Sequence, residues 1–527
     1  MTTRGTRESW RHNGQRGWNC WRGTPIKERV AIIGIDSLDP HLIVKHRERL
    51  PNLSQLIDES PTFIARSVWP VDTIPAWVSI YTGLRPSNHG LLYVYDVFDQ
   101  GLSDLAKLDV TPIKGRTFWD YASQAGCRTV IIAPTLMYPA WKLNGIMVSK
   151  SPFETRVDWL STSRAVSVYP EAIKDQYAIP NELLDLWGGF PGTKRLKEWA
   201  TLGNTALETE KDLGLKLFKG EEWDVFFIFF SVLDLIQHRL WRFFDENDPT
   251  YPGKNSCSDI ITDYYVSFDA LIGEFMRARP QATFIVMSDH GHHMRPTKTI
   301  NVNEYLRRHG FLVQQGKNTR LRDELRRLTL EAANKLNIEP TLIKLLARSK
   351  KMTQVGKSVY SSSGSIDREK STAFLSTFAG IKSYSHGGIE INRELVSDIE
   401  RSKITRELRK LFLELKTPQG DNAVACFKQR EELQHGDHSE EIYPDLLFEL
   451  ESDFGVGWDL HSDLFGKAYD HNVASGGHFK VATFLITGTT KEAARNEISI
   501  VDTAPTILDL LGLNWREFRF DGRSIFR

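Results

Sequence analysis

Short, nearly continuous apolar runs alternate with helical patterns along most of this chain, and that alternation constrains the fold more than any other feature. The runs are rich in β-branched and aromatic residues, which is typical of strands buried on both faces in a parallel sheet. The helical segments between them would cover both faces of that sheet. The chain is therefore predicted to be α/β, with a central, mostly parallel sheet and helices on both faces. The expected strands are Val30–Ile35, Thr129–Ala133, Asp224–Phe230, Thr283–Met287, Asp445–Leu450 and Val481–Thr487, and the expected helices are Thr73–Thr82, Arg116–Gln124, Ser258–Arg279, Lys403–Lys416 and Val501–Leu511.

Aspartate residues stand just after three of the expected strands. Asp36 directly follows the first strand, Asp234 follows the third, and Asp289 and His290 follow the fourth. Ligands of a parallel α/β sheet gather beyond the carboxyl ends of its strands. We therefore expect these side chains, which are far apart in the sequence, to meet at one edge of the sheet.

Histidines near these positions indicate a metal site. Asp234 and His238 are four residues apart, so in a helix both side chains lie on one face and can reach one cation. His478, in a Gly-Gly-His segment, adds a further imidazole. Carboxylate oxygen and neutral imidazole nitrogen suit zinc, and also manganese or iron. Each segment alone is more often an ordinary surface pair or turn, but their joint occurrence at strand ends favours a metal site.

Thr73 is the candidate nucleophile. It stands at the start of an expected helix, where free amides and the positive end of the helix dipole favour an anion. The alternative role for this residue is a plain helix N-cap. A nearby divalent cation would lower the pKa of its hydroxyl and so make the alkoxide accessible at neutral pH.

These segments together resemble the alkaline phosphatase superfamily, and within it the type I phosphodiesterase and nucleotide pyrophosphatase family. The resemblance covers about Val30 to Glu304 and Gly387 to Leu513. The motifs that carry it are Val30-Ala-Ile-Ile-Gly-Ile-Asp-Ser37, Asp72-Thr-Ile-Pro-Ala-Trp-Val-Ser79, Thr82-Gly83, Pro86-Ser-Asn-His-Gly90, Leu233-Asp-Leu-Ile-Gln-His238, Ser288-Asp-His-Gly291, Gly476-Gly-His478 and Ile500-Val-Asp-Thr-Ala-Pro-Thr-Ile-Leu-Asp-Leu-Leu-Gly512.

The resemblance implies a metal-dependent hydrolase of phosphoric esters with two divalent ions about 4 Å apart, zinc being expected and manganese or iron being alternatives. Thr73 would attack phosphorus in line and form a phosphothreonine intermediate. The leaving oxygen would lie beside the first ion, and water would then release the product. The first ion would be held by Asp234, His238 and His478, and the second by Asp36, Asp289, His290 and the Thr73 oxygen.

Two departures from related patterns narrow the substrate. Nucleotide pyrophosphatases commonly place an Asn a few residues after the His-Gly turn, whereas here His89-Gly90 is followed by Leu91-Leu-Tyr-Val94. The resemblance therefore does not extend to a nucleotide substrate. No Cys/Ser-x-Pro-x-Arg signature occurs at the Thr73 position, which disfavours sulfate esters. A phosphodiester is the expected substrate. The alternatives are a phosphomutase or phosphomonoesterase of the same superfamily, and a catalytically silent interaction protein that retains the fold.

Composition limits the expected partners and location. Lys plus Arg equals Asp plus Glu, so the formal net charge is zero and general nucleic-acid binding is not expected. The four cysteines form no CxxC pair, which favours a reducing compartment, with the cytoplasm as the expected location. The longest apolar run is shorter than the ~20 residues that a membrane-spanning helix needs. The partner is thus expected to be a small phosphorylated molecule.

Four regions are expected along the chain. Residues 1–29 would form a peripheral extension, and residues 30–316 the first part of a catalytic α/β core. Residues 317–380 would form a basic, leucine-rich helical insertion or cap, and residues 381–527 the second part of the core. The charges of the insertion are either solvated or attract an anionic substrate.

Overall fold

The computed structural model describes residues 28–92, 110–157, 160–186, 191–315, 319–336, 365–379, 383–433, 436–469, 471–495 and 497–526. All but the last two residues of the expected peripheral extension lie outside this part of the chain. The expected helical insertion is described in residues 319–336 and 365–379, and the first of these segments is helix α11 (Thr319–Leu336). None of the described helices has the length and apolar character needed to cross a membrane.

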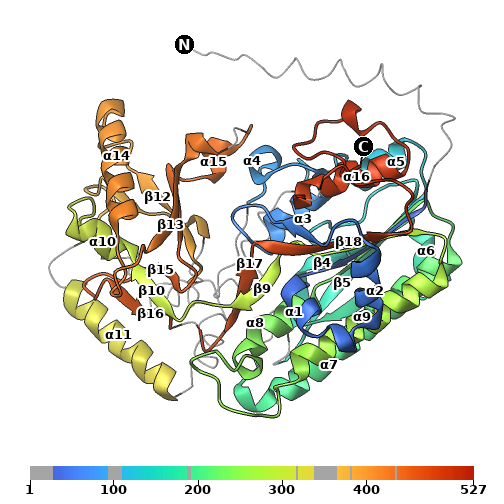
Figure 1. The fold of residues 1–527 in the computed structure, drawn as a ribbon, viewed down its shortest axis with the longest axis horizontal. Coiled ribbons are helices and arrows are strands. Elements are labelled where there is room, and N and C mark those ends of the chain that lie inside the picture. Colours follow the sequence, from blue (N-terminus) through green and yellow to red (C-terminus); the bar gives the residue numbers. More distant parts are fainter. Residues whose placement is uncertain are drawn as a thin grey trace.

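A sheet of nine strands forms the larger lobe of the molecule (Figure 1). The five central strands are parallel, and the strands at both edges are antiparallel to their neighbours. The sheet order is β2 (Ile64–Arg66), β18 (Val481–Thr487), β8 (Thr283–Met287), β1 (Val30–Ile35), β7 (Val225–Phe230), β3 (Thr129–Ile132), β4 (Gly145–Val157), β5 (Thr162–Tyr169) and β6 (Glu182–Asp185). The predicted α/β class with a mostly parallel central sheet is confirmed.

Helices cover both faces of this sheet, because successive side chains of each buried strand point to opposite sides. In β1, Ala31 and Ile33 belong to one apolar core, and Val30 and Ile32 belong to the other. The first core is completed by α1 (Pro40–Lys45), α2 (Pro51–Glu59), α7 (Leu196–Gly220), α8 (Val232–Phe244) and α9 (Ile260–Ala278). The second is completed by α3 (Thr73–Thr82), α5 (Phe118–Gln124) and α16 (Thr503–Leu510).

Helix α3 packs unusually close to β1. A Cβ atom on Gly34 of β1 would lie 2.7 Å from the ring of Trp77 of α3, so only glycine permits this approach. Every residue of α3 after Thr73 is buried, as in a helix that is apolar on all sides. The helix ends at Gly83, whose φ of +65° is a left-handed conformation that glycine adopts without strain. The close packing brings the start of α3 to the carboxyl end of β1.

A smaller lobe has its own apolar core (Figure 1). The helices of this smaller lobe include α10 (Val302–Arg308), α14 (Asp398–Glu414) and α15 (Ser439–Ile442). Its first sheet has the order β11 (Ala373–Leu375), β12 (His386–Ile391), β14 (Leu446–Leu450) and β13 (Val424–Gln429). Its second sheet has the order β15 (Phe454–Gly457), β10 (Lys298–Asn301) and β16 (Phe465–Lys467).

One predicted strand lies in this lobe and not in the central sheet. The run Asp445–Leu450 contains β14, which is antiparallel to both of its neighbours, so its assignment to a central parallel sheet was wrong. The smaller lobe buries β14 nearly as completely as the main sheet buries its own strands. Burial by either lobe produces the same apolar pattern, so the sequence pattern could not distinguish them.

A ribbon of two antiparallel strands lies between the lobes. It pairs β9 (Gly291–Met294) with β17 (Gly476–Phe479) and places His478 opposite His292. A Cβ atom on Gly476 would lie 2.3 Å from His292 Nε2 and 2.5 Å from the Gln237 carbonyl oxygen. Glycine at this position therefore allows β17 to approach α8 and β9.

Candidate active site

The candidate site lies at the carboxyl ends of three adjacent central strands. Strand β1 pairs in parallel with both β7 and β8, so Asp36, Asp234 and Asp289 emerge from the same edge of the sheet. The backbone N–H of Ser37 donates a hydrogen bond to Asp289 Oδ1 at 3.2 Å, which ties the ends of β1 and β8 together. The expected meeting of these distant residues at one sheet edge is thus observed.

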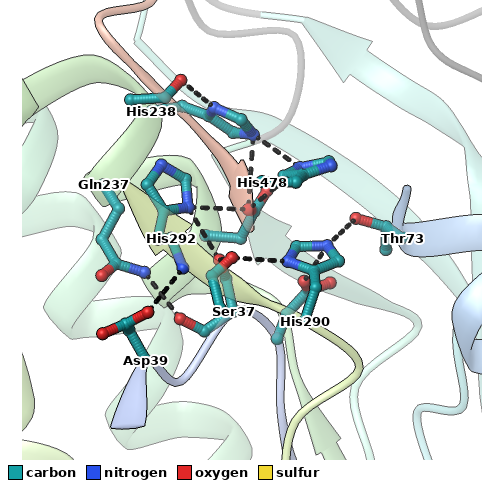
Figure 2. Close-up of polar contacts among 12 residues, drawn as sticks. Ser37, Asp39, Thr73, Gln237, His238, His290, His292 and His478 are labelled. Carbon is teal, nitrogen blue, oxygen red and sulfur yellow. Dashed lines mark hydrogen bonds and ion pairs between the residues drawn. The ribbon is translucent and has the colours of Figure 1, made fainter. Parts of the chain in front are cut away.

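Asp234, His238 and His478 form the first group of possible metal ligands. One atom from each residue lies within 4.8 Å of the others. Asp234 Oδ1 lies 3.3 Å from His238 Nε2 and 3.4 Å from His478 Nε2. His238 Nδ1 faces the Gly476 carbonyl oxygen at 2.7 Å, so this nitrogen carries the proton and leaves Nε2 as an electron-pair donor (Figure 2).

Asp36, Asp234 and His290 form the second group. His290 Nε2 lies 3.7 Å from Asp36 Oδ1 and 3.1 Å from Asp289 Oδ2. Asp234 belongs to both groups, a sharing that the sequence pattern did not indicate. The rings of His290 and His478 stack with their centroids 3.9 Å apart, so the two groups adjoin.

Buried carboxylate oxygens show that a cation fits this cluster. Asp36, Asp234 and Asp289 are nearly inaccessible to solvent. Within the described part of the chain, no donor in hydrogen-bonding geometry meets Asp36 Oδ1, Asp234 Oδ1 or Asp289 Oδ2. Buried carboxylates without donors are costly unless a cation compensates them. The donor set of oxygen and imidazole nitrogen is the one that zinc, manganese and iron accept.

The cluster has strongly perturbed electrostatics. Burial, together with the charges of neighbouring carboxylates, raises the pKa of Asp36 and of Asp289 well above the ordinary value. Burial alone would raise the pKa of Asp234 too, but His238 and His478 outweigh burial and hold it well below the ordinary value. Burial lowers the pKa of His478 well below its ordinary value, so the ring is neutral. A divalent cation requires neutral imidazole and ionised carboxylate ligands, and a bound cation would offset the repulsion between carboxylates that raises the pKa values of Asp36 and Asp289.

Thr73 faces the cluster from the start of α3. Its Oγ1 lies 3.3 Å from His290 Nε2 (Figure 2). Asp72 occupies the N-cap position and Thr73 is the first helical residue, so the alternative interpretation of Thr73 as a helix N-cap was wrong. The positive end of the helix dipole therefore points to the space in front of the Thr73 hydroxyl.

A hydrogen-bonded network supports the cluster from behind, and the sequence pattern did not reveal it (Figure 2). Ser37 Oγ lies 2.7 Å from His292 Nδ1, and Gln237 Nε2 donates to the Ser37 carbonyl oxygen at 2.9 Å. The His292 backbone N–H donates to Asp39 Oδ2 at 3.0 Å. The only available signal was adjacency, because each of these residues stands within three positions of a predicted ligand. Such supporting residues orient the ligands of a metal site.

A buried ionic network lies on the other side of Thr73. Lys150 Nζ contacts Glu210 at 2.7 Å and Asp185 at 3.2 Å, and Arg164 Nε contacts Asp185 at 2.9 Å. A cavity of about 60 Å³ extends from Asp36 and Thr73 to Lys150, Arg164 and Asp185. Burial would lower the pKa of Lys150, but Asp185 and Glu210 outweigh it and raise the pKa, so the ammonium group stays charged.

A match to a protein family identifies this chain as a hydrolase that acts on phosphoric ester bonds. Residues 30–369, more than half of the chain, match the family model described as type I phosphodiesterase / nucleotide pyrophosphatase. The chain belongs to this family, whose members hydrolyse phosphoric ester bonds, and the resemblance inferred from its motifs is confirmed. A search of curated proteins found no match.

Solved structures share the fold at low sequence identity. Phosphonoacetate hydrolase from Sinorhizobium meliloti 1021, in complex with phosphonoformate or with phosphonoacetate, superposes with a TM-score of 0.51 at 14% identity. Each of these comparisons covers 93% of this chain and 96% of the other. Murine ectonucleotide pyrophosphatase / phosphodiesterase 5 gives a TM-score of 0.47 at 12% identity and covers 94% of this chain and 97% of its own. At this identity the likeness concerns the fold alone.

Proposed function

We propose that this chain is a metal-dependent phosphodiesterase in which Thr73 is the nucleophile. The observation that carries the proposal is the set of three buried carboxylate oxygens without donors, which lie beside His238, His290 and His478. The Thr73 hydroxyl lies at the edge of the same cluster, 3.3 Å from His290. Few buried arrangements other than a catalytic metal centre would combine these features.

The residues divide naturally between two ions. Asp234, His238 and His478 would hold one ion, and Asp36, Asp289 and His290 would hold the other, together with the Thr73 oxygen. Zinc is the expected metal, with manganese or iron as alternatives. Bound divalent ions would neutralise phosphoryl charge and lower the pKa of a coordinated hydroxyl.

The side chains of this protein then have separate roles. Thr73 Oγ1 forms a bond to phosphorus while the bond from phosphorus to the leaving oxygen breaks, and the leaving alcohol takes a proton from solvent. Water then displaces Thr73 from phosphorus and releases a phosphomonoester. The dipole of α3 favours the negative charge on the Thr73 oxygen and on the phosphoryl group. The buried positions of Asp36 and Asp289 keep the charges that bind cations in a region of low dielectric.

The substrate is proposed to be a small phosphodiester and not specifically a nucleotide. Asn88, which lies next to the His-Gly turn, uses its amide to donate to both carboxylate oxygens of Asp521, at 2.8 and 2.9 Å. Its carbonyl oxygen accepts from Arg519 at 2.9 Å. This Asn side chain is therefore engaged in the fold, which agrees with the lack of a nucleotide-pyrophosphatase Asn after the turn.

Turnover of three substrates by the purified, metal-loaded chain tests the proposal. We expect bis-p-nitrophenyl phosphate to be hydrolysed with a higher kcat/KM than p-nitrophenyl phosphate. Phosphonoacetate is the third substrate, because it is bound in the similar Sinorhizobium enzyme. A preference for the monoester or for phosphonoacetate would replace the diesterase assignment. Isomer interconversion without release of phosphate would indicate a phosphomutase, and no turnover of any substrate with any of the three metals would support a silent interaction protein.

A further inference from the structure

A groove of about 410 Å³ separates the two lobes next to the candidate active site. One wall comes from the segment that precedes α3 and from β17, and the other comes from β12, β13 and β14 of the smaller lobe. We call it the interlobe groove. Its lining includes Arg66, Trp69, Cys426, Lys428 and His478.

His478 connects this groove to the metal-ligand cluster. Its Nε2 faces Asp234 at 3.4 Å, whereas its Nδ1 lies 3.3 Å from the carbonyl oxygen of Val71, which also lines the groove. The cavity of about 60 Å³ described above lies instead at Asp36 and Thr73. The two cavities therefore flank the cluster, the small one on the nucleophile side and the large one on the His478 side.

In-line displacement decides which cavity receives the leaving group. Thr73 approaches phosphorus from the His290 side, so the bond that breaks points to the opposite side, toward Asp234, His238 and His478. The organic part of the leaving alcohol would then need space beyond this group, and the interlobe groove, which His478 lines, offers such space among the described residues. Pockets for organic ligands are typically apolar with a few polar groups, which matches this groove.

The charge of the groove specifies the ligand further. Arg66, Lys428 and Lys480 face two acidic residues, Glu449 and Glu451, and only Lys480 has an ion pair there, at 3.2 Å with Glu449. Within the described part of the chain, no ion pair involves the side chain of Arg66 or Lys428. Lys428 also lies close enough to Glu432 to help lower the pKa of that carboxyl, so the rim of the groove carries a small excess of positive charge, to which Arg66 contributes.

Trp69 lines the groove and presents a flat apolar surface that suits a ring. The Trp69 ring lies 5.2 Å from that of Phe378, and Tyr443 donates a hydrogen bond to the Trp69 carbonyl oxygen at 3.1 Å. Trp69 is thus held in place by the smaller lobe. Ser67 is 8% exposed, and its hydroxyl has no hydrogen-bond partner among the described residues. This hydroxyl is itself buried, so Trp69 and not Ser67 offers the accessible surface here.

We propose that the interlobe groove binds the leaving alcohol of the diester and selects an alcohol that carries a negative charge, such as a carboxylate or a second phosphate. The proposal rests on the proposed function. It assigns Trp69 to the apolar part of the alcohol, and Arg66 and Lys428 to its charge.

A pair of chromogenic diesters tests the charge preference. Phenyl 3-carboxy-4-nitrophenyl phosphate and phenyl 4-nitrophenyl phosphate differ only in the carboxylate on the leaving group. The measured quantity is kcat/KM for the carboxylated diester divided by kcat/KM for the diester without the carboxylate. We expect this ratio to fall about threefold in Arg66→Gln or Lys428→Gln and about tenfold in the double variant, because each exposed ion pair with the carboxylate contributes a modest free energy. Lys467→Gln is the matched control, because Lys467 is exposed and does not line the groove, and it should leave the ratio at the parental value. An unchanged ratio in the double variant would overturn the charge preference.

Occupancy of the groove can be measured without turnover. Cys426 lines the groove and is half-buried, whereas Cys127 and Cys257 are buried. In a Cys20→Ser, Thr73→Ala chain, saturating carboxylated diester should slow maleimide modification of Cys426 severalfold. Lack of protection would overturn the groove assignment.

The two proposals fail in distinguishable ways. If the parental chain hydrolysed neither diester, the proposed function would fail, whereas parental rates in Thr73→Ala would reject only Thr73 as the nucleophile. If hydrolysis required Thr73 but Cys426 were unprotected, the groove assignment alone would fail.

Discussion

His238 Nε2 and His478 Nε2 lie only 2.9 Å apart, although the other ring nitrogen of each faces a backbone carbonyl oxygen. A nitrogen that faces a carbonyl carries the proton, so both Nε2 atoms present lone pairs to the same space. Two lone pairs at this distance repel one another. A cation between these two nitrogens and Asp234 would be coordinated by both lone pairs and would remove the repulsion. His478 is therefore expected to be a metal ligand.

Replacing His478 by Ala should remove one metal ion selectively. We expect the metal content of the purified chain to fall from about two ions toward one, because His478 belongs to one of two adjoining ligand groups. Elemental analysis of the dialysed protein measures this. His293→Ala is the control, since the His293 ring packs against Phe479 and belongs to neither group. An undiminished metal content in His478→Ala would remove this residue from the ligand set.

Thr73→Ala should abolish diester hydrolysis while leaving the fold intact. Thr73 is not the N-cap of α3, so the substitution removes no capping hydrogen bond. The covalent route disappears, and kcat should drop by about three orders of magnitude or more. Thr73→Ser retains the hydroxyl and should keep partial activity. Mass spectrometry of the acid-quenched parental reaction should also detect phosphate on Thr73. A folded Thr73→Ala chain with nearly parental kcat would show that water attacks phosphorus directly.

In the metal-free protein, the contribution of Asp36 and Asp289 to stability should fall as the pH rises, and Asp36→Asn should remove part of this fall. The folded-state pKa values of Asp36 and Asp289 are raised above the ordinary 3.8, so the folded state binds more protons than the unfolded state over this interval. The stability that these two carboxyl groups contribute is therefore fully present below their ordinary pKa. It is lost as the pH rises through their folded-state pKa values. Asp36→Asn removes one of the crowded charges and should stabilise the chelated chain at neutral pH.

Thermal unfolding in excess chelator at about pH 5 and about pH 8 measures this dependence. Buried histidines such as His478, whose pKa burial lowers, oppose this trend in both chains, so the prediction concerns the difference between them: from the lower to the higher pH, the stability of the parent relative to that of Asp36→Asn should fall. Asp453→Asn, at an exposed position, is the control and should behave like the parent. An equal change of stability in the parent and in Asp36→Asn would contradict the raised pKa of Asp36.

Lys150→Met should destabilise the chain strongly, because it leaves two buried carboxylates less well compensated. The side chains of Lys150, Asp185 and Glu210 are at most 10% exposed. Breaking a buried ion pair from one side costs about 3–5 kcal/mol, whereas replacing both partners by apolar residues is often neutral. The double variant Lys150→Met, Glu210→Leu should therefore recover much of the loss. Urea unfolding measures both, and Lys216→Met, exposed on the same helix as Glu210, serves as the control. A mild effect of Lys150→Met alone would indicate that water reaches the network.

Several elements could be predicted closely from the sequence because their patterns are local. The runs that became β1, β8 and β18 have the predicted bounds, since burial on both faces of a sheet demands an unbroken apolar run. Helix α3 also has its predicted bounds. The four-residue spacing of Asp234 and His238 placed both on one helical face, and the contact at 3.3 Å agrees with this. Periodicity and spacing determine such features without any knowledge of distant residues.

Only the tertiary structure decided which distant segments meet. The pattern of β14 records that it is buried but not which lobe buries it, so the smaller lobe was not anticipated from that strand. The sharing of Asp234 by two ligand groups, the contact of Ser37 with His292, and the ion pairs of Lys150 all join residues far apart in the sequence. An apolar run specifies a buried strand because burial is a property of the strand itself. A contact depends on the register and packing of both partners, and that information is absent from either segment taken alone.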